Sequence, residues 1–166
     1  MSPRRSAPPR RIMFVCFGNI CRSPMAEMVF RHLADEAGAG EAFEVSSAAT
    51  GCEEGRPVHP GTLDVLRRHG VPAYMRRSVL LLPEDADRYD LFVGMDARNA
   101  RAMRRILGEG AAEKICLLLD FTDEPRDIAD PWYTGDFEAA YRDVSAGAAA
   151  LLQRLIGEEN NEAEDQ

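Results

Sequence analysis

The feature that most constrains the fold is a regular alternation of short apolar runs with segments of helical periodicity. Four apolar runs are interpreted as buried strands: 11–16, 43–47, 90–94 and 114–118. The segments between and after them are predicted helices: Ser23 to about Ala37, about Leu63 to Gly70, Asp96 to about Leu107, and Phe137 to Ile156. Strands that alternate with helices indicate an α/β fold with a parallel sheet covered on both faces and joined by right-handed crossovers.

The start of the first long helix has a clear sequence signal. Ser23 is a favourable N-cap residue, and Pro24 suits the first helical position because its missing N–H would have no intrahelical partner there. Gly38 follows the last periodic residue and predicts the end of the helix. The sequence therefore places a helix N-terminus a few residues after the first strand.

The length of 166 residues suits one domain, predicted over 11–157. The ends, 1–10 and 158–166, are predicted to be a disordered basic and a disordered acidic tail. The net charge of −8 argues against nucleic acid as a partner, and no apolar run is long enough to cross a membrane. The four cysteines contain no Cys-x-x-Cys pair, and with three scattered histidines they are a poor set of metal ligands. We expect a reduced, cytoplasmic protein without a cofactor.

Two chemically important residues follow predicted strands. Cys16 ends the first strand, and Asp130 lies in the long polar loop 120–135 after the fourth. Ligands of open α/β sheets bind at the carboxyl ends of the strands, next to a switch in strand order. We therefore expect Cys16 and Asp130 to lie at the same edge of the sheet.

The segment Cys16-Phe17-Gly18-Asn19-Ile20-Cys21-Arg22-Ser23 has the character of an anion-binding loop. Between a strand and a helix, its backbone N–H groups can converge on a phosphate, and Gly18 permits a tight turn. Arg22 can hold two phosphate oxygens with its planar guanidinium. The same positive field favours the thiolate form of Cys16, which is then placed to attack phosphorus.

In these residues the chain resembles the low-molecular-weight protein tyrosine phosphatase family. The matching motifs are Cys-x5-Arg-Ser at 16–23, Ser47-Ala48-Ala49-Thr50-Gly51, and Asp130-Pro131-Trp132-Tyr133, and the resemblance runs from about Arg11 to Leu155. Together and in this order the three motifs are highly specific. The resemblance implies a three-layer phosphatase-loop fold with a four-stranded parallel sheet of order 2-1-3-4.

The resemblance also implies a role for each matching residue. Cys16 would be the nucleophile, Arg22 the phosphate-binding residue, and Asp130 the general acid and then the base. The remaining residues implied to bind substrate are Phe17, Gly18, Asn19, Ile20, Cys21, Ser23, Trp132 and Tyr133. Asn19 and Ser47 would support the loop, Ser23 would stabilise the thiolate, and no metal would be needed. The substrates would be phosphotyrosine proteins, and the chain a monomer or weak dimer.

Cys21 has two interpretations. It is a small side chain that packs the loop, or it forms a disulfide with Cys16 that protects the nucleophile from over-oxidation, as the resemblance implies. Cys116 falls in a predicted strand and is assigned to the core, and Cys52 is interpreted as an incidental loop thiol. The alternative for Asp130 is a turn residue before Pro131.

One departure from the family concerns the substrate slot. The family has an aromatic residue after its Ser-Ala-Gly-Thr segment, whereas this chain has Cys52-Glu53-Glu54-Gly55. The sequence therefore predicts that one wall of the slot is missing or acidic. Trp132 also stands where the family more often has Tyr.

Three other functions remain open at this point. A protein-arginine phosphatase on the same scaffold typically has Thr where this chain has Ile20, whose apolar bulk favours a phenyl ring. A thioredoxin-coupled arsenate reductase needs two further cysteines close together, which Cys52 and Cys116 do not provide. A phosphoprotein-binding module without activity would not need intact Cys16, Arg22 and Asp130.

Overall fold

A computed structural model describes residues 8–51 and 53–164. It contains a four-stranded parallel sheet with the strand order β2-β1-β3-β4, as predicted. The strands are β1 (Arg10–Cys16), β2 (Phe43–Ala49), β3 (Leu91–Gly94) and β4 (Ile115–Leu117). The α-helices are α1 (Arg22–Glu36), α2 (Pro60–Arg68), α3 (Ala97–Leu107), α4 (Pro131–Thr134) and α5 (Phe137–Glu164). The 3₁₀ turns are η1 (Gly40–Ala42), η2 (Pro83–Asp87), η3 (Glu109–Lys114) and η4 (Leu118–Phe121).

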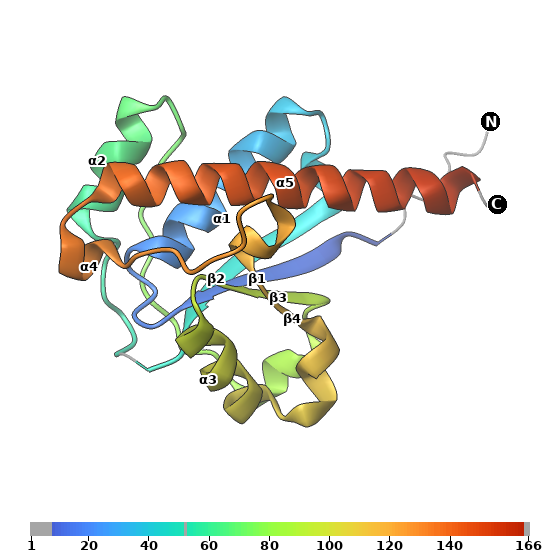
Figure 1. Ribbon diagram of the computed structural model, residues 1–166, viewed down its shortest axis with the longest axis horizontal. Helices are drawn as coiled ribbons and strands as arrows, with labels where there is room; N and C mark the ends of the chain where they lie inside the picture. Colours follow the sequence, from blue (N-terminus) through green and yellow to red (C-terminus); the bar gives the residue numbers. More distant parts are fainter. Residues whose placement is uncertain (1–7, 52, 165–166) are drawn as a thin grey trace.

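Helices cover both faces of the sheet, with α1, α2 and α5 on one side and α3 on the other (Figure 1). The side chains of β1 alternate between the two faces, as a pleated strand requires. Ile12 and Phe14 pack in the larger core under α1 and α5, whereas Met13 and Val15 pack in the smaller core under α3. Because both faces of β1 are buried, its sequence is a continuous apolar run.

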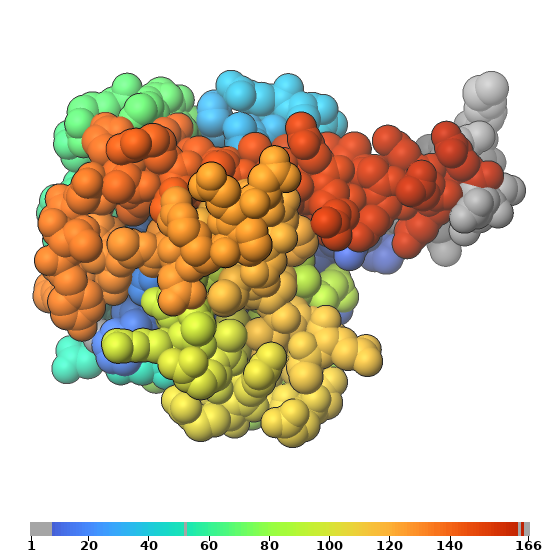
Figure 2. All heavy atoms as spheres, viewed as in Figure 1, coloured from blue at the N-terminus to red at the C-terminus, as the bar shows by residue number. Residues whose placement is uncertain are grey.

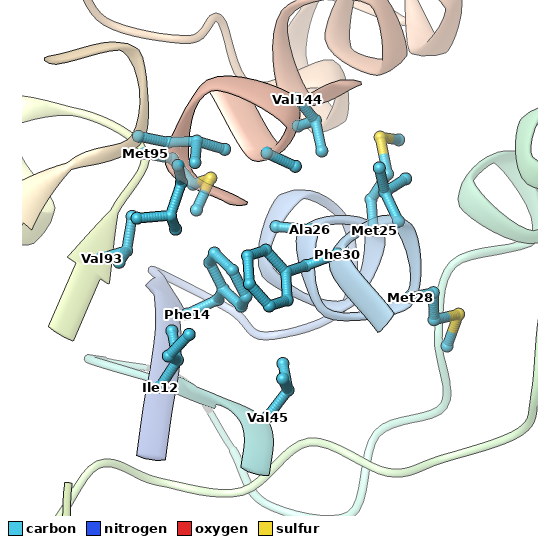
Figure 3. Packing of buried hydrophobic residues seen from close by; sticks show 14 of the residues in the cluster. Ile12, Phe14, Met25, Ala26, Met28, Phe30, Val45, Val93, Met95 and Val144 are labelled. Atoms are coloured by element: carbon cyan, nitrogen blue, oxygen red, sulfur yellow. The ribbon is translucent and has the colours of Figure 1, made fainter. Parts of the chain in front are cut away.

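Aromatic packing ties α1 to the sheet in the larger core (Figure 3). The ring of Phe30 lies 5.8 Å from that of Phe14 in β1 and 5.3 Å from that of Phe43 in β2, with the second pair edge to face. Such pairs contribute about 0.5–1.5 kcal/mol each beyond the burial of their surface. The rings therefore fix α1 against β1 and against the start of β2.

The start of α1 differs from the prediction. The helix begins at Arg22, and its N-cap residue is Cys21, which makes no side-chain capping hydrogen bond. Ser23, predicted as the N-cap, lies inside the first turn with its hydroxyl 3.0 Å from the Cys16 thiol. The N-cap prediction was wrong because the Ser23 side chain turns toward the sulfur instead of toward the helix backbone.

The ends of the chain also differ from the predicted tails. Arg10 is already the first residue of β1, and α5 continues through 158–164, where the sequence predicted disorder. Arg10 Nη1 donates to Glu158 Oε2 at 2.8 Å, so the first strand and the last helix are joined by an ion pair. The predicted tails at 1–7 and 165–166 lie outside the described residues. Among the residues that are described, no helix combines the length and the apolar character that crossing a bilayer requires.

Candidate active site

The candidate site lies at the carboxyl end of the sheet, in the loop between β1 and α1. Cys16 ends β1 and is 3% exposed. Its sulfur lies 3.0 Å from the hydroxyl oxygen of Ser23 and accepts a hydrogen bond of 3.3 Å from the backbone N–H of Asn19. The loop therefore places a hydroxyl and a backbone N–H directly against the sulfur.

Asn19 holds the shape of the loop from behind. Its backbone has a φ of 55°, a left-handed conformation that Asn tolerates better than most residues. Its side-chain amide donates to the hydroxyl oxygens of Ser23 at 2.8 Å and Ser47 at 2.9 Å. Its side-chain oxygen accepts from Arg76 Nη1 at 2.9 Å and from the backbone N–H of Val79 at 3.1 Å. These four hydrogen bonds hold the unusual backbone conformation in place.

A buried carboxylate continues this network away from the loop. Glu27 in α1 is 4% exposed and accepts a 2.9 Å hydrogen bond from the Ser47 hydroxyl. It also accepts from the hydroxyl of Tyr74 and lies 3.7 Å from Arg76 Nε. Burial and then the carboxylate of Glu27 raise the pKa of Tyr74, so its hydroxyl remains a donor at physiological pH. Glu27, Tyr74 and Arg76 were not predicted from the sequence. The available signal was the charge of Glu27 next to Ala26, on a helix face that was predicted to be buried.

Arg22 is held in a buried position at the edge of the loop. Its Nη1 donates to Asp96 Oδ2 at 2.7 Å and to the backbone oxygen of Ile128 at 2.8 Å, and its Nη2 lies 3.4 Å from Asp130 Oδ2. The Nε–H of Arg22 is buried and has no hydrogen-bond partner within the described part of the chain. A buried donor without a partner costs about 1–3 kcal/mol. The fixed guanidinium thus offers one donor to an anion.

Asp96 has a second role that the sequence did not reveal. It caps α3, as predicted, by accepting a hydrogen bond of 2.9 Å from the backbone N–H of Asn99. The other oxygen of the same carboxylate binds Arg22. The orientation of the guanidinium is therefore coupled to the N-terminus of α3.

The loop that carries Asp130 is fastened to two helices and to Met95, the residue that follows β3. Arg126 binds Asp143 in α5 through two hydrogen bonds of 2.8 Å, and Asp127 accepts from the backbone N–H of Ala97 at 3.0 Å. The backbone N–H of Ile128 donates to the oxygen of Met95 at 2.9 Å. Two-pronged arginine–carboxylate bonds are geometrically specific, so the loop is held in a defined position.

Asp130 itself begins α4 as its N-cap. The carboxylate accepts from the backbone N–H of Trp132 at 3.1 Å, and Pro131 occupies the first helical position. The structure is therefore compatible with both interpretations of Asp130, as a turn residue before Pro131 and as a site residue. Figure 1 shows α4 at the same end of the sheet as the loop that follows β1.

These elements enclose a slot of about 240 Å³. Its lining residues are Cys16, Phe17, Gly18, Ile20, Cys21, Arg56, Asp130, Trp132 and Tyr133. Phe17, Trp132 and Tyr133 are 53%, 54% and 79% exposed and form an aromatic rim. Six of the eight residues predicted to bind substrate therefore line the slot. The other two, Asn19 and Ser23, are buried and do not line it; their side chains hydrogen-bond to each other.

The slot wall that was predicted to be missing or acidic is formed by Arg56. Its guanidinium carbon lies 5.6 Å from the centroid of the Trp132 ring, within the range of a cation–π interaction. Glu53 and Glu54 do not line the slot, and Cys52 lies outside the described residues. The prediction was wrong because the chain between Gly51 and Pro57 places Arg56, rather than the acidic pair, beside Trp132.

His59 packs against Trp132, next to the slot wall that Arg56 forms. Its ring stacks on Phe137 at 4.9 Å and meets the ring of Trp132 edge-on at 5.9 Å. Nδ1 accepts a hydrogen bond of 2.9 Å from the backbone N–H of Gly61, so His59 is also the N-cap of α2. The ring links α2, α4 and α5, a role that its sequence context did not indicate.

The cysteines in the described part of the chain have different environments. Burial, with smaller contributions from Asp130 and Cys16, raises the pKa of Cys21 to about 12. Burial raises the pKa of Cys116 to about 12 as well, and its thiol faces the backbone oxygen of Phe92 in β3, away from the slot. Both groups remain thiols at neutral pH, and Cys21 shares the slot with Cys16.

This arrangement predicts a defined response to peroxide. We expect Cys16 to be oxidised first to a sulfenic acid, which the Cys21 thiol then attacks with release of water to form a disulfide. Activity should return after treatment with dithiothreitol, and mass spectrometry of the oxidised protein should show the 16–21 linkage. In the control variant Cys21→Ser, the same treatment should inactivate irreversibly. A sulfonic acid on Cys16 with Cys21 unmodified in the unsubstituted protein would contradict the prediction.

The sequence matches a family model and curated relatives over most of its length. The family model described as "Low molecular weight phosphotyrosine protein phosphatase" matches residues 11–161. The curated relative YfkJ of Bacillus subtilis is 37% identical over 147 residues, covering 87% of this chain and 94% of the relative. PtpA of Staphylococcus haemolyticus is 37% identical over 152 residues, covering 90% and 96%. Both relatives are named low molecular weight protein-tyrosine-phosphatases.

Solved structures agree with this assignment. The crystal structure of Bacillus subtilis YfkJ superposes with a TM-score of 0.88 at 36% identity, covering 93% of this chain and 98% of that chain. The match therefore includes both ends of the site, from the loop after β1 to α4. With the family model matching most of its length, the chain belongs to the low molecular weight phosphotyrosine protein phosphatase family.

Proposed function

We propose that this chain hydrolyses phosphotyrosine in proteins, with Cys16 as nucleophile, Arg22 as phosphate-binding residue and Asp130 as general acid and base. The observation that carries the proposal is the convergence of Cys16 and Asp130 on one slot, with Arg22 hydrogen-bonded to Asp130 beside them. The names of both curated relatives and the description of the family model support the same activity.

In the first step the Cys16 thiolate attacks phosphorus and the bond between phosphorus and the phenolic oxygen breaks. Backbone N–H groups of the loop and the free Nε–H of Arg22 bind the phosphate oxygens. Asp130 donates its proton to the departing phenolic oxygen, which leaves as tyrosine. The product on the protein is a cysteinyl phosphate.

In the second step a water molecule attacks the cysteinyl phosphate. Asp130, now a carboxylate, accepts a proton from the water, and the bond between sulfur and phosphorus breaks. Inorganic phosphate leaves, and the Cys16 thiolate is restored with Ser23 and the Asn19 backbone beside it. Each group thus ends the cycle in the form in which it began.

The lining of the slot supports a phenyl ring as the leaving group. Ile20 contributes an apolar wall, and Phe17, Trp132 and Tyr133 form an aromatic rim around the entrance. A flat aromatic ring buries more apolar surface between such walls than a charged phosphoguanidine would. We expect phosphotyrosine to be preferred over phosphoarginine for this reason.

The need for a reduced thiol at Cys16 limits the compartments in which the protein can act. The nucleophile must be a reduced thiol, and Cys16, Cys21 and Cys116 are free in the structure. A reducing compartment such as the cytoplasm suits this requirement. We propose phosphotyrosine proteins in that compartment as substrates, with the enzyme acting as a monomer or a weak dimer.

The proposal is tested by turnover of p-nitrophenyl phosphate, a phosphotyrosine peptide and a phosphoarginine peptide in the presence and absence of EDTA. We expect hydrolysis of the first two that EDTA does not change, because the loop amides and Arg22 meet the phosphate charge. Phosphoarginine turnover should be at least about tenfold lower in kcat/KM. Activity that EDTA abolishes and a divalent ion restores, or a preference for phosphoarginine, would overturn the proposal.

A further inference from the structure

A second groove, of about 770 Å³, adjoins the slot. The two share Phe17, Asp130 and Tyr133 in their linings, so the groove begins at the rim where a phosphotyrosine would enter. From there it runs along α3, which forms part of the molecular surface (yellow-green in Figure 2). A substrate chain leaving the slot on this side would lie against α3.

The side of α3 that lines the groove carries a stripe of arginines. Arg98, Arg101 and Arg105 line it, and their spacing of three and four residues places them on one helix face. All three are exposed. The helix holds four arginines and no acidic residue, although the whole chain has a net charge of −8. The groove is therefore a local positive surface on an acidic protein.

The stripe as a whole contributes little to the stability of the helix. Positive charges spaced three or four residues apart repel one another, and Arg98 lies in the first turn, where the helix dipole disfavours a cation. Of the three, Arg105 alone lies in the last turn, where the dipole favours one. Within the described residues, none of the three arginines forms a salt bridge, whereas Arg68 pairs with Glu138 at 3.0 Å. An anionic partner would thus relieve the repulsion within the stripe and the unfavourable position of Arg98.

The acidic residues of the groove already have partners. Asp96 binds Arg22 and the backbone of Asn99, and Asp127 accepts from the backbone N–H of Ala97. Asp130 binds the backbone of Trp132. Hydrogen bonds within the protein therefore engage these three carboxylates, and the arginine stripe is left to meet a ligand.

From this charge arrangement we propose that the stripe of Arg98, Arg101 and Arg105 binds acidic side chains beside the phosphotyrosine of a substrate, and so selects substrates with acidic flanking sequences. The proposal rests on the proposed phosphatase function. Seven residues of helix rise about 10 Å between Arg98 and Arg105, which three residues of an extended peptide span. We expect the recognised segment to hold two or three Asp or Glu residues on one side of the phosphotyrosine.

The test compares kcat/KM for three phosphotyrosine peptides: one with three Glu before the phosphotyrosine, one with three Glu after it, and one with Gln at all six positions. The variant Arg98→Gln/Arg101→Gln/Arg105→Gln removes the stripe. Arg104→Gln is the matched control, because Arg104 is exposed on the same helix but does not line the groove. Turnover of p-nitrophenyl phosphate reports the slot alone.

We expect the unsubstituted enzyme to prefer one of the Glu peptides over the Gln peptide, and the triple variant to lose about 5- to 50-fold in kcat/KM on that peptide. The Gln peptide and p-nitrophenyl phosphate should change less than about twofold, and Arg104→Gln should behave as the unsubstituted enzyme. The preference should weaken with added salt. Equal rates on all three peptides, or the same loss in Arg104→Gln, would overturn the inference, whereas failure to hydrolyse any phosphotyrosine peptide would overturn the proposed function itself.

Discussion

Replacement of Cys16 by Ser is expected to lower the turnover of p-nitrophenyl phosphate by roughly 10⁴-fold or more, because a hydroxyl is a far weaker nucleophile than a thiolate at neutral pH. Binding of inorganic phosphate should remain, since the loop amides and Arg22 supply the contacts. The fold should be unchanged, because Ser is nearly the same size and can keep the hydrogen bonds to Ser23 and Asn19. Steady-state kinetics and isothermal titration calorimetry with phosphate measure the two effects.

Arg22→Lys is the companion variant. It should lose both turnover and phosphate binding. A single ammonium cannot bind Asp96 and Ile128 and also present the donor that Arg22 Nε offers, which has no partner among the described residues. The two variants together separate the nucleophile from the binding group. Turnover by Cys16→Ser at the unsubstituted rate would show that another group attacks phosphorus.

Replacement of Asp130 by Asn is expected to slow hydrolysis of phosphotyrosine by about 10²- to 10⁴-fold. The phenolate of tyrosine is a poor leaving group that needs a proton as its bond to phosphorus breaks, and Asn has none to give. An aryl phosphate with a strongly acidic phenol should be slowed much less. Asn is also a good N-cap, so the hydrogen bond to the Trp132 backbone and the start of α4 should persist.

The comparison of the two substrates separates a chemical role of Asp130 from a structural one. Loss of a proton donor slows mainly the substrate with the poor leaving group, whereas damage to the slot slows both substrates alike. The control is Asp127→Asn, three residues earlier in the same loop, where the carboxylate accepts from the backbone N–H of Ala97 and does not line the slot. Equal slowing of both substrates would assign Asp130 a structural role only.

The core strands were predictable because β1 is buried on both faces, which leaves a continuous apolar run in the sequence. The end of α5 was not, because the acidic segment after Gly157 resembles a solvated tail unless its partner is known. The ion pair between Arg10 and Glu158 joins residues that are 148 positions apart, and no local sequence pattern predicts it. Local patterns therefore predicted which segments are strands and helices, while tertiary contacts decided where α5 ends.

The site shows the same division. Cys16, Arg22 and Asn19 were found because eight neighbouring residues carry a recognisable pattern. Asp96 and Arg76 were missed because each acts on that loop from another part of the chain, at separations of 74 and 57 residues. Their contributions are hydrogen bonds to Arg22 and Asn19, which exist only in the folded protein.

The clamp between Arg126 and Asp143 has a consequence for the timing of synthesis. It attaches the loop that carries Asp130 to α5, the last element of the chain, and Arg22 and Asp130 are themselves 108 residues apart. At about 5–20 residues per second, the ribosome produces the nucleophile loop several seconds before the helix that steadies its acid. A growing chain therefore carries the nucleophile for several seconds before it can hold its acid in place, and dephosphorylation begins only after α5 has been made.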